Sequence, residues 1–191
     1  MSGTSPVAII IGHRASSQGA VNVNGISEWV WNEQLAGMIS PVLDRLGVPH
    51  DIVYRPDMPG GYSALVGELN AAGYSLNVSL HFNAAAQASA TGIETLCYPG
   101  SAVGTKLAEA IQSRMVATLH LADRGVKPTK VNGAGVELKV ITRTQAPTAL
   151  VESHFGSNRR DVMFADRYKT ALGDAIAQGV AETWKSLGEG I

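Results

Sequence analysis

The sequence predicts a single-domain α/β sandwich, in which helices flank a mostly parallel, twisted central sheet. Short β-branched apolar runs alternate along the chain with longer stretches of helical periodicity. Glycine- and proline-containing segments separate the two kinds of element. The 191 residues contain no internal repeat, low-complexity segment or linker. We therefore assign residues 1–191 to one domain.

The first third of the chain contains the clearest strand and the clearest helix. Residues 7–11 are apolar and β-branched, which is typical of a buried central strand, and residues 14–27 have the composition of a loop. Ser27 is the expected N-cap of a helix that Gly47 ends. One face of that helix is apolar and consists of Trp31, Leu35, Met38, Ile39, Val42, Leu43 and Leu46.

The remaining elements follow from the same two periodicities. We expect strands at residues 50–54, 76–80, 93–98, 136–141 and 148–151, and helices at residues 62–72, 103–121 and 166–187. The connecting loops are residues 56–61, 84–91 and 123–135. The loop at 84–91 is short and consists mainly of small residues, which predicts an open cleft.

Composition excludes several classes of function. The formal net charge is −1, so no basic surface predicts a nucleic-acid partner. The single cysteine, Cys97, cannot form an intramolecular disulfide and is expected to be a half-buried strand residue. The N-terminus lacks the pattern of a signal peptide, and the first apolar run is too short to insert into a membrane. We expect synthesis in the cytoplasm, unless a leader has been removed.

Ligand-type side chains follow three expected strands and begin one helix. His13, His81 and Glu152 follow strands, and the carboxyl ends of parallel strands are where sites gather. With Glu28 at the helix start, two histidines and one carboxylate make a known catalytic zinc set. The remaining carboxylate is then available as a general base.

Each candidate also has a structural interpretation. A lone histidine after a strand is more often a hydrogen-bonded structural residue, and a glutamate in a first helical turn often interacts with the helix dipole. Glu33, in the same helix, is an alternative ligand to Glu28. Glu152 differs, because it follows the apolar run 149–151 and a carboxylate there needs a partner or a shifted pKa.

Several motifs, taken together and in order, resemble the zinc-dependent N-acetylmuramoyl-L-alanine amidases of the family-3 type. They are Gly12-His13 with Gly19-Ala20, Gly25-Ile-Ser-Glu28 with Asn32, Val78-Ser-Leu-His81-Phe-Asn83-Ala84, Gly92-Ile-Glu-Thr95, Asp123-Arg-Gly-Val-Lys127, and Pro147-Thr-Ala-Leu-Val-Glu152 with Phe155 and Asn158. The fifteen-residue spacing from His13 to Glu28 is similar to that of the family.

The resemblance implies a specific chemistry on peptidoglycan. His13, Glu28 and His81 would bind Zn²⁺, and Glu152 would activate a zinc-bound water. The water would attack the amide carbonyl that joins the lactyl group of N-acetylmuramic acid to L-alanine, while zinc stabilises the oxyanion. Glu152 would then pass the proton to the leaving amine.

Three further residues are expected near the substrate. Asn83 is expected to hydrogen-bond around His81 or to cap a loop. Arg124, like its neighbour Lys127, could meet a peptide carboxylate or be solvated. His154 replaces a glycine of the family pattern and could touch substrate or be a loop histidine. The chain also departs from that pattern at Arg14 and Ala15. In the helix near residues 63–70 the arginine of the family is missing, and Leu65, Val66 and Glu68 stand there instead.

Two rival functions stay open from the sequence alone. A zinc peptidase could cut within the stem peptide of peptidoglycan, and a non-catalytic module could bind the wall with its metal centre lost or structural. Glu152 argues against the second rival. A compact amidase of this kind suits a phage lysin, released to the cell wall, or a bacterial autolysin. We expect a monomer.

Overall fold

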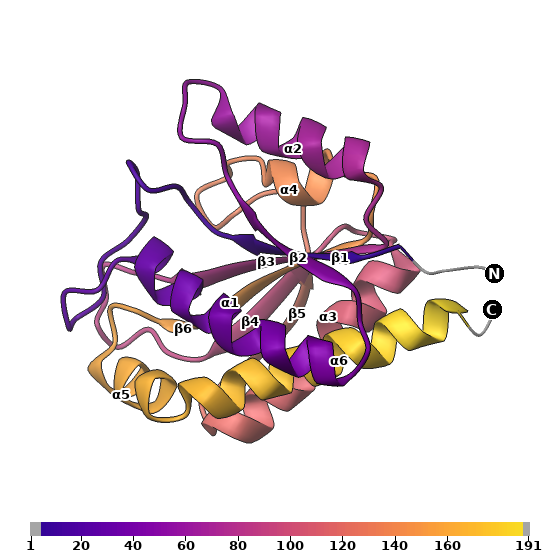
Figure 1. The fold of residues 1–191 in the computed structure, drawn as a ribbon. Helices are drawn as coiled ribbons and strands as arrows, with labels where there is room; N and C mark the ends of the chain where they lie inside the picture. The colour runs from indigo at the N-terminus through magenta and orange to yellow at the C-terminus, as the bar shows by residue number, and fades with distance from the viewer. Residues whose placement is uncertain (1–4, 189–191) are drawn as a thin grey trace.

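The computed structural model describes residues 5–188, which form one six-stranded sheet covered by helices on both faces (Figure 1). The first four residues, which belong to the segment without a signal-peptide pattern, lie outside the described range. The strands are β1 (Val7–Ile11), β2 (His50–Tyr54), β3 (Leu76–Asn83), β4 (Ile93–Cys97), β5 (Asp123–Pro128) and β6 (Thr148–Phe155). The helices are α1 (Glu28–Arg45), α2 (Gly61–Ala72), α3 (Ala102–Leu119), α4 (Lys139–Thr142), α5 (Arg159–Arg167) and α6 (Lys169–Gly188).

The sheet has the order β2-β1-β3-β6-β4-β5, and the prediction of a mostly parallel sheet is confirmed. Neighbouring strands are parallel except for β4, which runs antiparallel to β6. The carboxyl ends of β1, β3 and β6 therefore meet at one edge of the sheet, which is where parallel α/β folds place their sites.

The two faces of the sheet are covered unequally. Helices α1, α3 and α6 lie together below the sheet in Figure 1, whereas only α2 and the short α4 lie above it. Side chains of β1 alternate between the two layers: Val7, Ile9 and Ile11 join the large cluster on the α1 side, and Ala8 and Ile10 join a smaller cluster with α2 and α4. The α2 side is thus the thinner layer, and space remains there for a pocket.

Helix α1 begins as predicted. The Ser27 side chain accepts a hydrogen bond from the backbone N–H of Val30, and Gly47 has a positive φ of 70° just past the helix end. The predicted apolar face is at the core, with Trp31, Leu35 and Ile39 almost fully buried. Cys97 is completely buried, deeper than expected.

Three predicted elements of the second half were wrong. Residues 123–128 form the edge strand β5 rather than a loop, because backbone pairing with β4 overrides their glycine, lysine and proline content. Residues 136–141 are not a strand: Val131 and Glu137 close a small hairpin, and the short α4 buries the adjacent pair Val140 and Ile141. The terminal helix is two helices, α5 and α6, and the sequence analysis missed α5, which begins at its N-cap Asn158.

Two strands are also longer than predicted. β3 extends to Asn83 and β6 to Phe155, so His81 and Glu152 lie within strands rather than after them. The pairing of β3 with β6 shifts between His81 and Asn83, where three residues of β6 advance against two of β3. No helix in the described part of the chain combines the length and apolarity needed to cross a membrane.

Asp161 connects α5 to the sheet and gives a test of this packing. Its fully buried carboxylate accepts hydrogen bonds from the Thr91 hydroxyl (2.6 Å), the Gly92 amide (2.9 Å) and the Phe155 amide (3.1 Å). Asp161→Ala leaves three donors without a partner and is expected to lower the free energy of unfolding by about 2–4 kcal/mol.

Urea denaturation followed by circular dichroism measures this change. The exposed Glu109→Ala, on α3, is the control and should stay within about 0.5 kcal/mol of the unmodified chain. Equal effects of the two substitutions would contradict the structural role of Asp161.

Candidate active site

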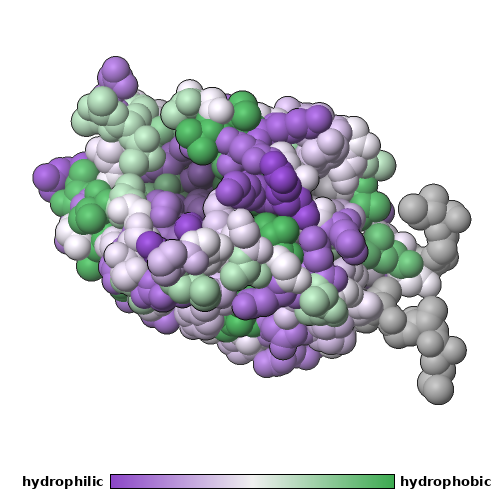
Figure 2. Space-filling view, turned by 90° about the horizontal axis from the view of Figure 1, so that it is seen from above, coloured by the Kyte–Doolittle hydropathy of each residue, from purple (hydrophilic) through white to green (hydrophobic). Residues whose placement is uncertain are grey.

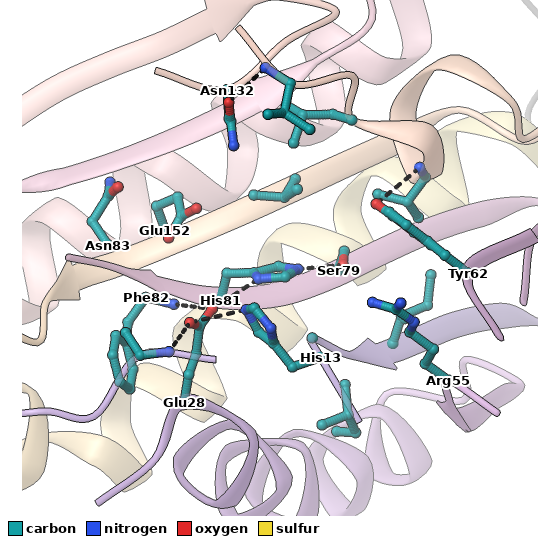
Figure 3. Close-up of a pocket in the computed structure, with 18 of the residues that line it drawn as sticks. His13, Glu28, Arg55, Tyr62, Ser79, His81, Phe82, Asn83, Asn132 and Glu152 are labelled. Carbon is teal, nitrogen blue, oxygen red and sulfur yellow. Dashed lines mark hydrogen bonds and ion pairs between the residues drawn. The ribbon is translucent and has the colours of Figure 1, made fainter. Parts of the chain in front are cut away.

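The three predicted metal ligands come together in the structure (Figure 3). Nε2 of His13 lies 3.0 Å from one carboxylate oxygen of Glu28, and Nδ1 of His81 lies 2.8 Å from the other. One donor atom from each of the three residues falls within 4.8 Å of the others. The alternative ligand Glu33 is not in this cluster and instead accepts a hydrogen bond from the hydroxyl of Tyr54.

Four donors converge on the Glu28 carboxylate. Besides the two imidazoles, the backbone amides of Ala20 and Phe82 lie 3.3 Å from its oxygens. Burial alone would raise the pKa of Glu28, but the hydrogen bonds and charges of His13 and His81 outweigh it and lower that pKa to about 2. Glu28 is therefore an anion at neutral pH, as a metal ligand must be.

Glycines allow the cluster to close. A side chain at Gly12 would lie 2.5 Å from the His81 ring, and one at Gly19 would lie 2.6 Å from His13 and 2.7 Å from Glu28. His13 itself has a φ of 66°, in the left-handed region that non-glycine residues rarely adopt. The backbone at the end of β1 is therefore held in an unfavourable conformation that directs His13 toward Glu28.

Ser79 is a site residue that the sequence analysis did not identify. Its hydroxyl lies 3.1 Å from Nε2 of His81, the nitrogen that does not face Glu28. This contact fixes the orientation of the ring and leaves Nδ1 directed into the cluster. The alternation of a strand could have identified Ser79, because residues 79 and 81 of one strand project to the same face of the sheet.

Glu152 lies beside the cluster in the same pocket. It stands opposite His81 on β3 and opposite Glu94 on β4, so the three side chains project to one face of the sheet. Its Oε2 atom is enclosed and has no hydrogen-bond partner within the described residues. Burial, followed by the negative charges of Glu28 and Glu94, raises the pKa of Glu152 well above its ordinary value.

Glu94 organises the side chains on the other flank of Glu152. It accepts hydrogen bonds from Asn83 (2.8 Å) and Arg124 (2.8 Å) and pairs with Lys127. Burial opposes ionisation of Glu94, but these donors outweigh it and lower the pKa. The expectation that Asn83 hydrogen-bonds around His81 is therefore wrong, because its amide is directed to Glu94. Arg124 lies in a strand rather than a loop and stacks over the Phe155 ring.

His154 does not lie at the surface, and the expectation of a substrate contact or a loop position is wrong. Its side chain is fully buried, with ring centroids 4.6 Å from Trp31 and 5.0 Å from Phe82. The extra residue of β6 after Glu152 turns it to the α1 side of the sheet. Burial lowers the pKa of His154 to about 3, so it is a neutral core residue.

The cluster and Glu152 line a pocket of about 480 Å³ on the thinner face of the sheet. Figure 2 shows a hollow on this face with hydrophilic residues at its border. Arg55 and Tyr62 line one side of the pocket, and Asn132, Gly133 and Ala134 line another. The hairpin at residues 130–138 therefore forms a wall of the pocket, which the sequence analysis did not predict.

The donor set fits a zinc ion. Two imidazole nitrogens and one ionised carboxylate are ligand types that zinc prefers, and three protein ligands leave a coordination position open for catalysis. The close approach at Gly12 and Gly19 and the hydrogen bond between Nε2 of His81 and the Ser79 hydroxyl are the kind of support that metal-binding histidines receive.

Comparison with known proteins identifies the family. Residues 7–182 match the sequence model of the N-acetylmuramoyl-L-alanine amidase family, and the chain belongs to this family. The protein is accordingly an amidase that acts on peptidoglycan.

Individual relatives and one solved structure are similar to this chain over most of its length. The chain is 31% identical to the uncharacterized protein YqiI of Bacillus subtilis over 91% of its own length and 82% of that protein. It is 28% identical to the N-acetylmuramoyl-L-alanine amidase LytC of the same organism, over 91% of this chain but 34% of LytC. The catalytic domain of an endolysin targeting Clostridia difficile has the same fold, with a TM-score of 0.80 at 23% identity, covering 93% of this chain and 97% of that domain.

Ionisation of Glu28 gives a testable dependence of stability on pH in the chelated, metal-free chain. Because its pKa in the folded state is about 2, below the ordinary 4.5, its contribution is fully present above about pH 4.5 and is lost as the pH falls toward 2. At pH 7, Glu28→Gln should therefore lower the free energy of unfolding by roughly 3 kcal/mol.

Chemical denaturation of both chains between pH 7 and pH 3 measures this difference, which should shrink as the pH falls below about 4.5. A difference that stays constant over this range would contradict the assignment of the lowered pKa to Glu28.

Proposed function

We propose that this protein hydrolyses the amide between the lactyl group of N-acetylmuramic acid and L-alanine with a zinc ion held by His13, Glu28 and His81. The observation that carries the proposal is the position of Glu152, an enclosed carboxylate in the same pocket as this donor cluster. When bound, zinc supplies a Lewis acid for the scissile carbonyl and for the attacking water.

Glu152 is the proposed general base and acid. Its unpartnered Oε2 has the capacity to accept a proton from the attacking water. The raised pKa makes the protonated form accessible, so that the same group can deliver the proton to the leaving amine of L-alanine. A carboxylate fully engaged by cations, as Glu94 is, would be a poorer base because its pKa is lowered.

The surrounding residues position these groups. Ser79 orients His81 through the nitrogen that faces away from the cluster. Glu94 keeps Asn83 beside the pocket and holds Arg124 and Lys127 on the far flank of Glu152. Asn83 is proposed to contact the substrate, since it lines the pocket. Arg124 is proposed to contact the substrate at the edge of the pocket.

The alternative to the proposed reaction is cleavage within the stem peptide, and analysis of the products distinguishes the two. The proposed reaction releases stem peptides with a free L-alanine amine, whereas a stem peptidase leaves L-alanine attached to the glycan. Action at the cell wall follows from the substrate, and a monomer stays our prediction for size-exclusion measurements.

Substitution of Glu152 tests the proposed roles. Glu152→Gln keeps the size of the side chain but removes its basicity, and should lower kcat by at least about 100-fold on purified peptidoglycan while zinc stays near one per chain. His81→Ala should lose both zinc and activity, because two ligands rarely hold the ion. Elemental analysis and mass spectrometry of released fragments give the two readouts.

Glu33→Gln is the matched control, because Glu33 lies on the same helix as Glu28 but outside the donor cluster. It should keep both zinc and activity. Retention of activity by Glu152→Gln would refute the assignment of the base, and absence of zinc from the unmodified chain would refute the ligand set.

A further inference from the structure

Arg55 occupies a distinctive place in the pocket. Arg55 follows directly after β2, on the opposite side of the donor cluster from Glu94. Among the described residues that line the pocket, Arg55 is the one lysine or arginine. Figure 3 shows its head group directed from the β2 edge toward the middle of the pocket.

The guanidinium of Arg55 is positioned but unpaired. Its carbon lies 4.7 Å from the centre of the Tyr62 ring, and Tyr62 is itself fixed by a hydrogen bond from the Val140 amide to its hydroxyl. No carboxylate of residues 5–188 forms an ion pair with Arg55, and its Nε is enclosed without a hydrogen-bond partner there. A buried, unsatisfied donor of a charged group is costly unless a ligand completes it.

Two acidic residues, Asp57 close to Arg55 in the chain and Glu137 in the lining of the pocket, are already engaged. Asp57 accepts hydrogen bonds from the backbone and hydroxyl of Ser16 and pairs with Arg14. Glu137 is held by Arg143 at 2.8 and 3.1 Å and by Thr142 at 2.8 Å. Arg124 and Lys127 contrast with Arg55, because both of them form ion pairs with Glu94.

We propose that Arg55, stacked on Tyr62, binds a carboxylate of the stem peptide and thereby makes the enzyme selective for stems whose second residue carries a free carboxylate. In peptidoglycan the residue after L-alanine is D-glutamate joined through its γ-carboxyl, so its α-carboxyl is either free or capped as an amide. A planar guanidinium recognises a carboxylate through paired hydrogen bonds that a carboxamide cannot reproduce. This inference rests on the proposed function, because it takes the stem peptide as the ligand of the pocket.

The selectivity is tested by binding rather than by turnover. Isothermal titration of the zinc-loaded Glu152→Gln chain would use two ligands, N-acetylmuramoyl-L-alanyl-γ-D-glutamyl-L-lysine and the same compound with the α-carboxyl of D-glutamate as a carboxamide, so that the γ-carboxyl is in amide linkage in both. The carboxylate form should bind at least about tenfold more tightly, the effect of a charged hydrogen bond. Adding Arg55→Met should remove this preference, and adding Arg55→Lys should retain part of it, because lysine keeps the charge but loses the paired geometry.

Lys139→Met is the matched control. The Lys139 ammonium also approaches the Tyr62 ring, at 6.0 Å, but Lys139 does not line the pocket. Its removal should change the affinity for both ligands equally, by about twofold or less. Thermal unfolding of the Arg55 variants would verify that they are folded.

The outcomes separate this inference from the proposed function. Equal binding of the two ligands, binding of neither, or a preference that survives Arg55→Met would overturn the role of Arg55. Hydrolysis of both ligands by the unmodified chain tests the amidase reaction separately. Hydrolysis without a carboxylate preference overturns the inference alone, whereas a preference without hydrolysis overturns the proposed reaction alone.

Discussion

The hydrogen bonds that Glu28 accepts from two histidines are the constraint on which the rest of the site depends. His13 comes from the end of β1, His81 from β3 and Glu28 from the first turn of α1, so the pair of contacts fixes three elements relative to one another. Such close approach has no room for side chains at Gly12 and Gly19, and it requires a positive φ at His13. Local backbone strain at β1 is thus balanced by the donors that gather on one buried carboxylate.

A row of titratable groups across the sheet extends this arrangement. His81, Glu152 and Glu94 occupy neighbouring positions on β3, β6 and β4, where side chains of paired residues lie close together. The two carboxylates differ because their surroundings differ. Cations and an amide engage Glu94 and lower its pKa, whereas Glu152 is enclosed between two anions and its pKa is raised. Environments that separate the pKa values of similar groups are how one fold assigns different chemical roles to them.

The sequence was sufficient to predict an element where its local pattern and the tertiary structure agree. The strand before His13, the cap at Ser27 and the helix that carries Glu28 all have strong local signals, and the resemblance of the motifs to the amidase family implied the donor cluster. The sequence was insufficient to predict elements whose structure is decided by pairing with distant parts of the chain. The edge strand β5 forms because β4 offers backbone partners, and Asn158 begins a helix of only nine residues that is rich in charged side chains, which hides it from a search for apolar runs. A single extra residue in β6 buries His154, and no property of histidine itself signals that bulge.

The uneven covering of the sheet relates the fold to its substrate. The layer of α1, α3 and α6 buries most of the core and can hold the strand ends rigidly, while the lighter layer of α2 and α4 leaves the other face accessible. A polymer must reach the site from this open face, so selectivity has to come from groups that border the pocket rather than from enclosure. The anionic side chains of that pocket lie at the end that holds the donor cluster of His13, Glu28 and His81 or are engaged by neighbouring cations, and Arg55 places its one permanent positive charge at the β2 end. A peptide stem that places its scissile amide at the donor cluster and a carboxylate at Arg55, as we propose, would satisfy both ends of this charge distribution at once.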